Sequence, residues 1–398
     1  MQEGPMYNIK IYNNIAEEGL ACLGDCFKRT ETLKNADCVI VRSADLHEKE
    51  FPDSLIAIAR AGAGVNNIPL DRCARHGIVV FNTPGANANA VKELVLTGLL
   101  MAARNVPEAM EWVKDLEDNV AESVEKYKGK FAGHEVMSRT IGVVGLGAVG
   151  VLVANAAEDL GMKVIGYDPY ITVDSAHLLS NTIPVYKDMN AMLSQCDYIT
   201  IHVPFMKETE GLLNKKHFEQ AKDGLCVLNF ARNGLVNEED ILELLKVGKI
   251  RKYITDFPTE KILRHKNVLC IPHLGACTAE SELNCARMAA TELADYMLNG
   301  NIANAVNLPD CSLGNLRSAA RISILNKNIA GMLSIITGIL SDMKVNISDM
   351  INKSKGEMAY TLIDIDSPVD EDRLRAALAV DGIISVRLLY PQTDERCV

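Results

Sequence analysis

The sequence lacks the features that mark membrane, secreted and nucleic-acid-binding proteins. No apolar run approaches the roughly 18 residues that a membrane span needs, and the first residues, MQEGPMYNIK, lack the basic region and apolar core of a secretion signal. Acidic residues outnumber basic ones, and the formal net charge of -11 at pH 7 disfavours binding to nucleic acids or to anionic membrane surfaces. We therefore expect a cytoplasmic protein whose partner is a small molecule.

The sequence also lacks an ordered cysteine pattern. Its 11 cysteines are scattered and include no C-x-x-C pair, which argues against a disulfide framework and against a zinc site. We expect reduced cysteines that serve as packing residues, and no bound metal.

The order of apolar segments predicts three layers of structure in this chain of 398 residues. In the first hundred residues, short β-like runs such as YNIKIY and GIVVFN alternate with helical segments, as in a parallel α/β sheet, and a long helix is expected around residues 88–105. A second series from residue 140 has six strand-like runs, and a helix between Thr278 and Gly300 follows it. The last segments, from residue 321, have the order βαββαβ of a ferredoxin-like module.

A glycine-rich turn opens the second series. In TIGVVGLGAVG, Gly145, Gly147 and Gly150 stand between an apolar strand and a helix, so backbone amides at the start of the helix can face a diphosphate. Asp168 ends the next strand, near the spacing at which a carboxylate binds an adenosine ribose, although it could instead cap the turn at Pro169. Because a carboxylate repels a 2′-phosphate, the pattern predicts NAD rather than NADP.

Three polar residues fall near the carboxyl ends of later strands, where such sheets bind their ligands. Arg232 in NFARNG could bind a carboxylate with two hydrogen bonds, and His273 in CIPHLG could exchange a proton with a substrate hydroxyl. Glu260 could orient the imidazole and stabilise its charged form. The alternatives are that His273 is a packing residue, that Arg232 forms a surface ion pair and that Glu260 is a solvated loop residue.

Five long segments in the same order make the chain resemble the D-2-hydroxyacid dehydrogenase family over nearly its whole length. They are RAGAGVNNIPLDRCARHGIVVFNTPGANANAVKELV, IGVVGLGAVG, DYITIHVPFMKETEGLLN, NFARNGLV and IPHLGACTAES. The resemblance is greatest to members that act on D-3-phosphoglycerate and carry a C-terminal ACT domain. It implies an α/β chain with a split substrate-binding domain (residues 1–103 and 275–308), a doubly wound Rossmann domain that binds NAD (104–274), and a ferredoxin-like ACT regulatory domain (318–398).

The same resemblance assigns further residues to the site. It implies that Arg42, Ser43 and Asn87 contact a substrate phosphate, and that the segment GAGV, with Ala63 and Gly64, presents backbone amides to the substrate carboxylate, which Arg232 and His273 also contact. Further implied cofactor contacts are Ala148, Val149, His202, Val203, Pro204, Thr209, Phe230, Ala231, Asp256, Gly275 and Ala276. A packing role for His202 is an equal alternative.

Two positions depart from the family's pattern. The family often has an aspartate two residues before the phenylalanine of its D-V-F motif, where this chain has Thr255, and Asp256 lies one residue further on. The proline that usually follows the glutamate is Lys261 here. These departures leave open whether Asp256 contacts the cofactor and whether Glu260 is the partner of His273.

The C-terminal module allows two interpretations. Ferredoxin-like modules can pair edge to edge, so this one could serve only to hold copies of the chain together. The resemblance implies in addition an effector site for L-serine, with Asn326, Asn328 and Asn346 at the matching positions. Both interpretations need a homo-oligomer, either a homo-dimer or a homo-tetramer.

The expected activity is NAD-dependent oxidation of 3-phospho-D-glycerate to 3-phosphohydroxypyruvate, the first step of L-serine biosynthesis, with regulation by L-serine. One alternative is a dehydrogenase for another D-2-hydroxy acid, such as D-lactate or glycerate, which offers no phosphate to Arg42 and Ser43. A second alternative is a non-catalytic binding protein of the same fold that senses NAD.

Overall fold

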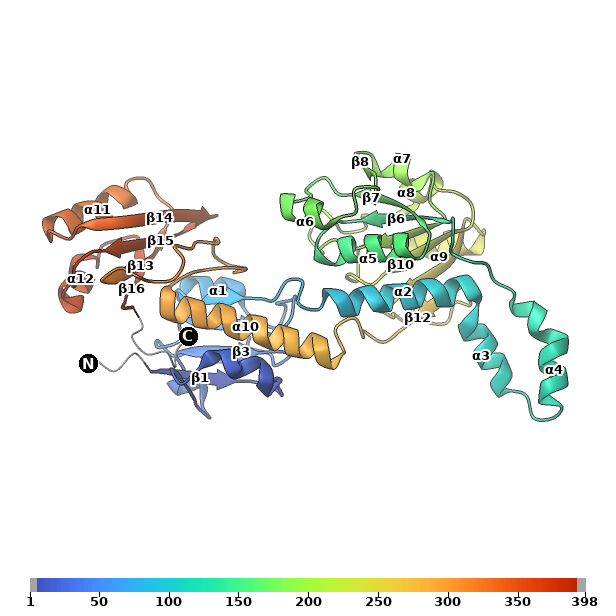
Figure 1. Cartoon of the computed structure of the whole chain (residues 1–398), viewed down its shortest axis with the longest axis horizontal. Helices are drawn as coiled ribbons and strands as arrows, with labels where there is room; N and C mark the ends of the chain where they lie inside the picture. The colour runs from blue at the N-terminus through green and yellow to red at the C-terminus, as the bar shows by residue number, and fades with distance from the viewer. Residues whose placement is uncertain (1–5, 392–398) are drawn as a thin grey trace. The chain divides into compact units, whose positions relative to one another are not determined.

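The computed structural model of the chain describes residues 6–391 and divides them into two compact units. The first unit contains the residues before Asn87 together with those from Ala279 onward, and the second contains residues 87–278 (Figure 1). The chain therefore leaves its first unit, forms the second, and returns.

A five-stranded parallel sheet with the order β2-β1-β3-β4-β5 forms part of the first unit. Its strands are β1 (Tyr7–Ile11), β2 (Phe27–Arg29), β3 (Cys38–Val41), β4 (Ala57–Arg60) and β5 (Val79–Phe81). The 3-10 helices η1 (Glu17–Leu23) and η2 (Leu33–Asn35) and the helix α1 (Leu70–Arg75) connect them. Strands β3 and β5 are buried along their whole length, as a parallel sheet covered on both faces requires.

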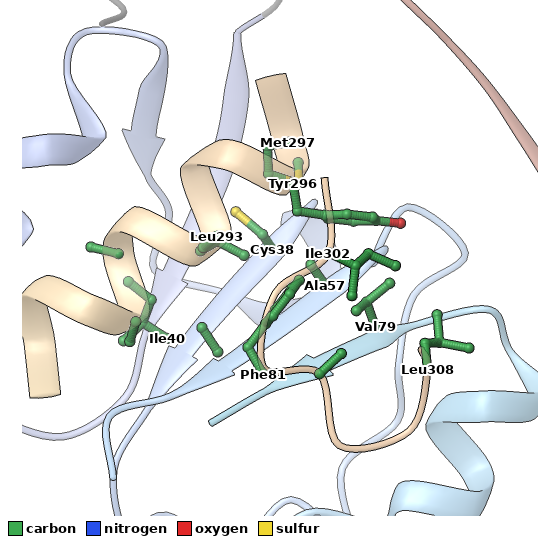
Figure 2. Close-up of a cluster of buried hydrophobic side chains, with 14 of the residues drawn as sticks. Cys38, Ile40, Ala57, Val79, Phe81, Leu293, Tyr296, Met297, Ile302 and Leu308 are labelled. Atoms are coloured by element: carbon green, nitrogen blue, oxygen red, sulfur yellow. The ribbon is translucent and has the colours of Figure 1, made fainter. Parts of the chain in front are cut away.

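Helix α10 (Ala279–Asn299) covers one face of this sheet. Its Tyr296 packs against Phe81 of β5 with 5.7 Å between the ring centroids (Figure 2). On its other side α10 contacts η1, where a Cβ added to Gly19 would lie 2.5 Å from the Cβ of Ala286. The prediction of a helix that ends before Gly300 and returns to the first sheet is confirmed.

A four-stranded antiparallel sheet with the order β14-β15-β13-β16 completes the first unit. Its elements are β13 (Ala320–Lys327), α11 (Met332–Asp342), β14 (Ile347–Lys355), β15 (Met358–Ile365), α12 (Glu371–Ala377) and β16 (Ile383–Leu389). Leu340 of α11 and Leu374 of α12 are buried together against the strands. The predicted order βαββαβ and the ferredoxin-like layout are confirmed.

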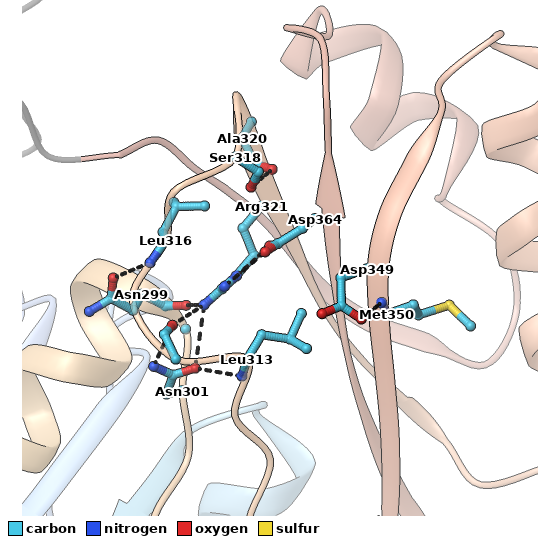
Figure 3. Close-up of polar contacts among 12 residues, drawn as sticks. Asn299, Asn301, Leu313, Leu316, Ser318, Ala320, Arg321, Asp349, Met350 and Asp364 are labelled. Carbon is cyan, nitrogen blue, oxygen red and sulfur yellow. Dashed lines mark hydrogen bonds and ion pairs between the residues drawn. The ribbon is translucent and has the colours of Figure 1, made fainter.

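A buried arginine ties this module to the end of α10 (Figure 3). The guanidinium of Arg321 donates to both carboxylate oxygens of Asp364, at 2.6 and 3.0 Å. Its Nη1 also donates to the carbonyl oxygens of Asn299 and Gly314, each at 2.8 Å. Arg321 has 0% exposure, and a charge so buried is stable only when it is paired and hydrogen-bonded, so this cluster holds the module against α10.

The second unit is built on a seven-stranded parallel sheet with the order β12-β11-β10-β9-β6-β7-β8. Its strands are β6 (Thr140–Val144), β7 (Lys163–Tyr167), β8 (Val185–Tyr186), β9 (Tyr198–Ile201), β10 (Leu225–Asn229), β11 (Ile250–Thr255) and β12 (Val268–Cys270). Six of these strands were predicted, and the seventh, β8, has only two residues. This order is the doubly wound arrangement of a Rossmann domain.

Helices cover the sheet of the second unit and extend from it. They are α2 (Ala88–Arg104), α3 (Val106–Lys114), α4 (Val120–Tyr127), α5 (Ala148–Asp159), α6 (Val173–Leu178), α7 (Met189–Leu193), α8 (Lys215–Glu219) and α9 (Glu238–Lys246), with the 3-10 helix η3 (Lys128–Phe131). Helix α2 packs on α5, β10 and β11, and α9 packs on β11. Helices α3 and α4 contain no buried residue and form an arm beyond α2 (Figure 1).

The cysteines between residues 6 and 391 agree only in part with the sequence prediction. Nine of them are free thiols; six of these are buried, as expected of packing residues, whereas Cys22 and Cys277 are exposed. Cys397 lies outside the described residues. Cys26 is disulfide-bonded, so the expectation of a reduced cysteine is wrong there. Within residues 6–391, no helix combines the length and the apolar character that crossing a bilayer needs, and no three metal-binding side chains gather in one place.

Replacing Arg321 with Met tests whether the cluster in Figure 3 holds the module. The substitution leaves the Asp364 carboxylate and two carbonyl oxygens without their donor, so we expect the free energy of unfolding to fall by about 3–5 kcal/mol. Urea denaturation followed by circular dichroism measures this loss. The matched control is Arg29→Met, which breaks an exposed pair with Glu17 and should cost less than about 1 kcal/mol. Equal losses in the two variants would contradict the prediction.

Candidate functional site

The carboxyl ends of the parallel strands in the second unit bring polar groups to one edge of the sheet. Strands β6 and β9 are the neighbours between which the chain changes direction through the sheet, which is where doubly wound folds bind ligands. The residues at these strand ends are the turn at Gly145 after β6, Asp168 after β7, His202 after β9, Arg232 after β10, Asp256 after β11 and His273 after β12.

The glycine-rich turn is shaped by contacts that only glycine permits. Gly145 has a φ of +89°, and a Cβ there would lie 2.7 Å from the carbonyl oxygen of His202. A Cβ on Gly150 would lie 1.8 Å from the carbonyl oxygen of Gly145. Gly147, in contrast, has nothing within 4 Å of its Cβ position, so the space in front of the first turn of α5 is open. Free amides at a helix start beside open space fit a diphosphate.

Asp168 holds this turn in place. Its Oδ2 accepts a hydrogen bond from the backbone nitrogen of Leu146, and its Oδ1 accepts one from that of Tyr170, both at 2.8 Å. The capping role is therefore present in the structure. Each carboxylate oxygen can accept a second hydrogen bond, so a ribose hydroxyl could still bind here.

His202 and Thr209 stabilise the loop after β9. The Nε2 atom of His202 lies 2.9 Å from the Oγ1 of Thr200, and burial lowers the pKa of His202 to about 3, so its ring is neutral at physiological pH. The Thr209 hydroxyl donates to the carbonyl oxygen of Pro204 at 2.7 Å and accepts from the nitrogen of Met206 at 2.8 Å. These contacts give both residues a structural role.

Arg232 lies exposed on a loop fixed by a buried asparagine. The Nδ2 of Asn229 donates to the carbonyl oxygen of Arg232 at 2.9 Å, and its Oδ1 accepts from the nitrogen of Ala231 at 3.2 Å. The guanidinium donates to the carbonyl oxygen of Ala231 at 2.7 Å, and it has no ion pair within residues 6–391. Arg232 is thus available to an anionic ligand. Sequence reasoning missed Asn229, whose signal is its place directly before the FAR segment.

The carboxylate of Asp256 interacts electrostatically with His273 and Arg232. His273 is exposed, and its ring lies 4.8 Å from the ring of Phe257. Burial raises the pKa of Asp256; the charge of His273, hydrogen bonds from the backbone nitrogens of Asp256 and Gly275, and the charge of Arg232 oppose the rise. Glu260 is exposed, and no hydrogen bond or ion pair joins it to His273 in the part of the chain that the structure describes. Asp256 is therefore a second candidate, beside the predicted Glu260, for the carboxylate that partners His273.

The proposed phosphate contacts Arg42 and Ser43 lie in the first unit, directly after β3. The Oδ1 of Asn13 accepts hydrogen bonds from the backbone nitrogens of Arg42 and Ser43, at 3.3 and 2.9 Å, which fixes this turn. The Arg42 guanidinium forms an ion pair of 2.7 Å with Glu282 in the first turn of α10. Sequence reasoning missed both Asn13 and Glu282, because neither is near Arg42 in the chain.

The remaining predicted substrate contacts divide between the two units. Ala63 and Gly64 follow β4 in the first unit, where the Nδ2 of Asn82 donates to the carbonyl oxygen of Ala63 at 2.7 Å. Asn87 precedes α2 in the second unit, together with Arg232.

The three predicted effector residues lie at opposite ends of the module sheet. Asn326 pairs with Ala359 near the start of β15, and Asn328 follows it in the chain. Asn346 directly precedes Ile347 of β14, which pairs with Ile365 of β15. Ile365 is six residues after Ala359 along β15, so at the usual rise of a strand the two ends are about 20 Å apart. Asn326 and Asn328 are thus close to each other, and Asn346 is distant from both within one chain.

The chain is similar in sequence and fold to known dehydrogenases. The sequence model of the D-isomer specific 2-hydroxyacid dehydrogenase, NAD binding domain, matches residues 96–275, so this part of the chain is an NAD-binding domain. The D-3-phosphoglycerate dehydrogenase of Haemophilus influenzae is 30% identical over 393 residues, which are 95% of this chain and 92% of that protein. The protein of the same name from Methanocaldococcus jannaschii is 31% identical over 364 residues, which are 88% of this chain.

Other relatives are longer than this chain. The chain spans 67% of the length of the Methanocaldococcus jannaschii protein and 59% of that of the Archaeoglobus fulgidus protein. Among solved structures, the NAD+-bound 3-phosphoglycerate dehydrogenase of Entamoeba histolytica is 27% identical with a TM-score of 0.59, covering 76% of this chain and 99% of that one. D-2-hydroxyisocaproate dehydrogenase, 21% identical with a TM-score of 0.63 over 75% of this chain and 99% of that one, shares the fold.

Alanine substitutions at Gly147 and Gly150 distinguish an effect on cofactor binding from an effect on folding. We expect Gly147→Ala to leave the thermal unfolding temperature of the cofactor-free protein unchanged, because its Cβ meets no atom within 4 Å, and to weaken NAD binding tenfold or more because the Cβ occupies the space of the diphosphate. Isothermal titration with NAD measures the affinity. Gly150→Ala is the contrasting variant and should lower the unfolding temperature itself, since its Cβ clashes with Gly145. Unchanged NAD affinity in Gly147→Ala would mean that the diphosphate binds elsewhere.

Proposed function

Because the chain belongs to the D-isomer specific 2-hydroxyacid dehydrogenase family, we propose that it is a cytoplasmic, NAD-dependent oxidoreductase that converts 3-phospho-D-glycerate to 3-phosphohydroxypyruvate, the first step of L-serine biosynthesis. One observation carries the proposal: Arg232 and His273, both free of ion pairs within residues 6–391, stand at strand ends of the sheet that carries the glycine-rich turn. A cation for a carboxylate and a proton acceptor for a hydroxyl are what oxidation of a 2-hydroxy acid needs.

In the proposed reaction, each side chain at the strand ends has a separate task. Bound NAD supplies the acceptor for the hydride that leaves C2 of the substrate. Arg232 binds the substrate carboxylate with two charge-assisted hydrogen bonds and so fixes C2 in place. His273 takes the proton of the C2 hydroxyl as general base. A carboxylate stabilises the protonated imidazole, and Glu260 and Asp256 are the two candidates.

Residues of the first unit supply the proposed preference for a phosphorylated substrate. A phosphate carries up to two negative charges, and Arg42 together with the hydroxyl of Ser43 offers it a cation and a hydrogen-bond donor on one turn. D-Lactate and glycerate lack this group and gain nothing from Arg42. We therefore favour 3-phosphoglycerate over another D-2-hydroxy acid, and over a binding protein without turnover.

The proposed division of tasks follows the three sheets. We assign substrate binding to residues 1–103 and 275–308, NAD binding to residues 104–274, and regulation to residues 318–398, the ACT domain. In this proposal NAD contacts the turn from Gly145 to Gly150, together with Asp168 and the loops after β9, β10 and β12.

We also propose a homo-oligomer, a dimer or a tetramer, regulated by L-serine. Two features support it. The α3–α4 arm exposes apolar side chains, with Met110 57% and Val120 45% exposed, and a second copy of the chain could cover them. The separation of Asn346 from Asn326 within one chain means that one serine molecule can contact both only where modules of two copies meet.

A substrate panel tests the proposed activity. We expect NADH formation, followed by absorbance, to be at least a hundredfold faster in kcat/KM with 3-phosphoglycerate than with D-lactate or D-glycerate. Arg42→Ala should raise the KM for 3-phosphoglycerate tenfold or more while leaving D-glycerate unaffected, because only the phosphate uses this guanidinium. Lys49→Ala, at an exposed lysine of the same unit, is the control for loss of surface charge. Turnover of D-lactate alone would refute the phosphate assignment.

Titration with L-serine tests the regulatory proposal. We expect L-serine to inhibit the wild type, and Asn346→Ala to raise the inhibitory concentration tenfold or more without changing uninhibited turnover. Asn352→Ala is a control on the strand that follows Asn346, because Asn352 donates to Thr361 within the sheet and is not a predicted effector residue. L-Alanine at equal concentration controls for ligand specificity. If L-serine has no effect on any variant, the module is structural.

A further inference from the structure

A polar pocket lies at the edge of the second unit's sheet that is opposite to the candidate functional site. It has a volume of about 570 Å³ and is built where strands β10, β11 and β12 begin, whereas the candidate site lies where the strands end. No acidic residue of the described chain lines it. The polar side chains in its lining are those of Asn105, His134, Arg251, Lys252 and Asn267.

A β-bulge at the start of β11 brings two cations to this pocket. Leu225 of β10 pairs with Ile250 of β11. The next residue of β10 pairs with Lys252, so Arg251 is an extra residue on β11. Successive side chains of a regular strand point to opposite faces, but a bulge changes the direction of a side chain and is common beside functional sites. Arg251 and Lys252 therefore both line the pocket, although they are adjacent in the chain.

Only one of the two cations is neutralised. Lys252 is 5% exposed, and its ammonium forms an ion pair of 2.5 Å with Glu108 of α3. Arg251 forms no ion pair with any carboxylate of residues 6–391. Its guanidinium donates to the hydroxyl of Tyr198 at 3.2 Å and interacts with the thiol of Cys226, and both of these partners are neutral at physiological pH. Because a guanidinium has five N–H donors, several remain free for a ligand.

A chain of hydrogen bonds prepares His134 as a further donor. The Nε2 of His134 lies 2.6 Å from the Tyr198 hydroxyl, which accepts from Arg251. Because Tyr198 has no other hydrogen-bond acceptor among the described residues, its hydroxyl donates to Nε2. The hydrogen of the neutral ring is then on Nδ1, which has no partner within the described chain. His134 and Arg251 contact the same hydroxyl, so one ligand can reach both.

Positive charge dominates around the His134 ring. Burial, followed by the charges of Arg251 and Arg139, lowers the pKa of His134. A smaller effect of Asp197 opposes this change, and Asp197 is itself paired with Lys222 at 3.2 Å. The pocket is thus locally cationic in a chain whose formal net charge is -11. An anion gains from such a site even where the whole protein repels it.

We propose that this pocket binds the phosphate group of a small ligand, at a site separate from the one that binds NAD. Arg251 binds two phosphate oxygens with charge-assisted hydrogen bonds, and the Nδ1–H of His134 donates to the third. The side-chain amide of Asn267 forms no hydrogen bond within residues 6–391 and is left for the rest of the ligand. The pocket is large enough for a phosphorylated metabolite. The inference goes beyond the proposed function, which uses none of these residues.

Titration with inorganic phosphate, followed at the His134 ring, tests the inference. In protein labelled with 13C-histidine, the NMR signal that disappears in His134→Gln identifies the ring. Saturating NAD keeps phosphate out of the glycine-rich turn. We expect phosphate to move the His134 signal to a plateau, and sodium chloride at equal ionic strength, the control for screening, to produce no plateau. A signal that phosphate leaves unmoved, or that chloride moves equally, refutes the inference.

Two arginine variants separate the pocket from the general charge of the surface. Arg251→Met removes the unpaired cation and should raise the half-saturating phosphate concentration at least tenfold. Arg139→Met is the matched control, because Arg139 is exposed, does not line the pocket and acts on His134 only through its charge. We expect less than about a twofold change in this control. Equal losses in the two variants would mean that phosphate responds only to net charge.

Asn267→Asp keeps the test decisive if Arg251→Met does not fold. Aspartate has the shape of asparagine, and the hydrogen bonds of Asn267 use its backbone alone: its carbonyl oxygen accepts from Tyr253 at 3.0 Å, and its nitrogen donates to the His265 ring at 3.3 Å. The new carboxylate repels a phosphate in the pocket, so we expect at least tenfold weaker binding with an unchanged unfolding temperature. Phosphate binding that neither Asn267→Asp nor Arg251→Met weakens overturns the inference.

An organic phosphate identifies the source of the phosphate group. If glucose 6-phosphate moves the His134 signal at a tenfold lower concentration than inorganic phosphate does, the ligand is a phosphorylated metabolite, which is the result we expect from the size of the pocket. Equal concentrations would assign the site to the free ion. None of these measurements uses a 2-hydroxy acid, so a protein that oxidises none would refute the proposed function and leave the phosphate site standing.

Discussion

Burial of both faces of a parallel sheet is the constraint on which the second unit depends. Strands β9 and β10 are buried along their entire length, so charged side chains have no place on either face. Most charged groups therefore lie at the strand ends, which the parallel strands bring to one edge. An exception is Lys252 of β11, which is 5% exposed and paired with Glu108. The glycine-rich turn, Arg232, Asp256 and His273 lie at that edge.

In the first unit, two arginines of the module, the buried Arg321 and the half-buried Arg387, hold the end of α10. Arg387 donates to the carbonyl oxygen of Met297 at 2.7 Å, next to the bonds that Arg321 makes with Asn299. The other end of α10 carries Glu282, the partner of Arg42. The helix has 21 residues, about 30 Å at the usual rise, so it joins the module to the turn that carries the proposed phosphate contact.

Sequence periodicity predicted the elements whose signal is local, and not the contacts that depend on folding. The glycine-rich turn, the helix α10 and the order βαββαβ were all predicted, because each depends on neighbouring residues. Strand β8 was missed because two residues carry no period. The ion pair of Arg42 with Glu282 joins residues 240 apart, and no spacing rule relates them. For Asp256, the sequence showed the departure from the family's motif, but only the pairing of β11 with β12 shows that its segment runs beside the one that carries His273.

The pairing of Arg42 with Glu282 has a consequence for selectivity. Their side chains are 32% and 42% exposed, so the pair contributes about 1 kcal/mol or less to stability. A phosphate that displaces Glu282 exchanges one negative charge for nearly two and gains charge-assisted hydrogen bonds from the turn at Ser43. A ligand without a phosphate leaves the existing pair intact and neither gains nor loses by it. In the proposed function, selectivity at Arg42 would therefore come from attraction of the phosphorylated substrate and not from rejection of the others, and smaller 2-hydroxy acids would be discriminated against only by the contacts they fail to make.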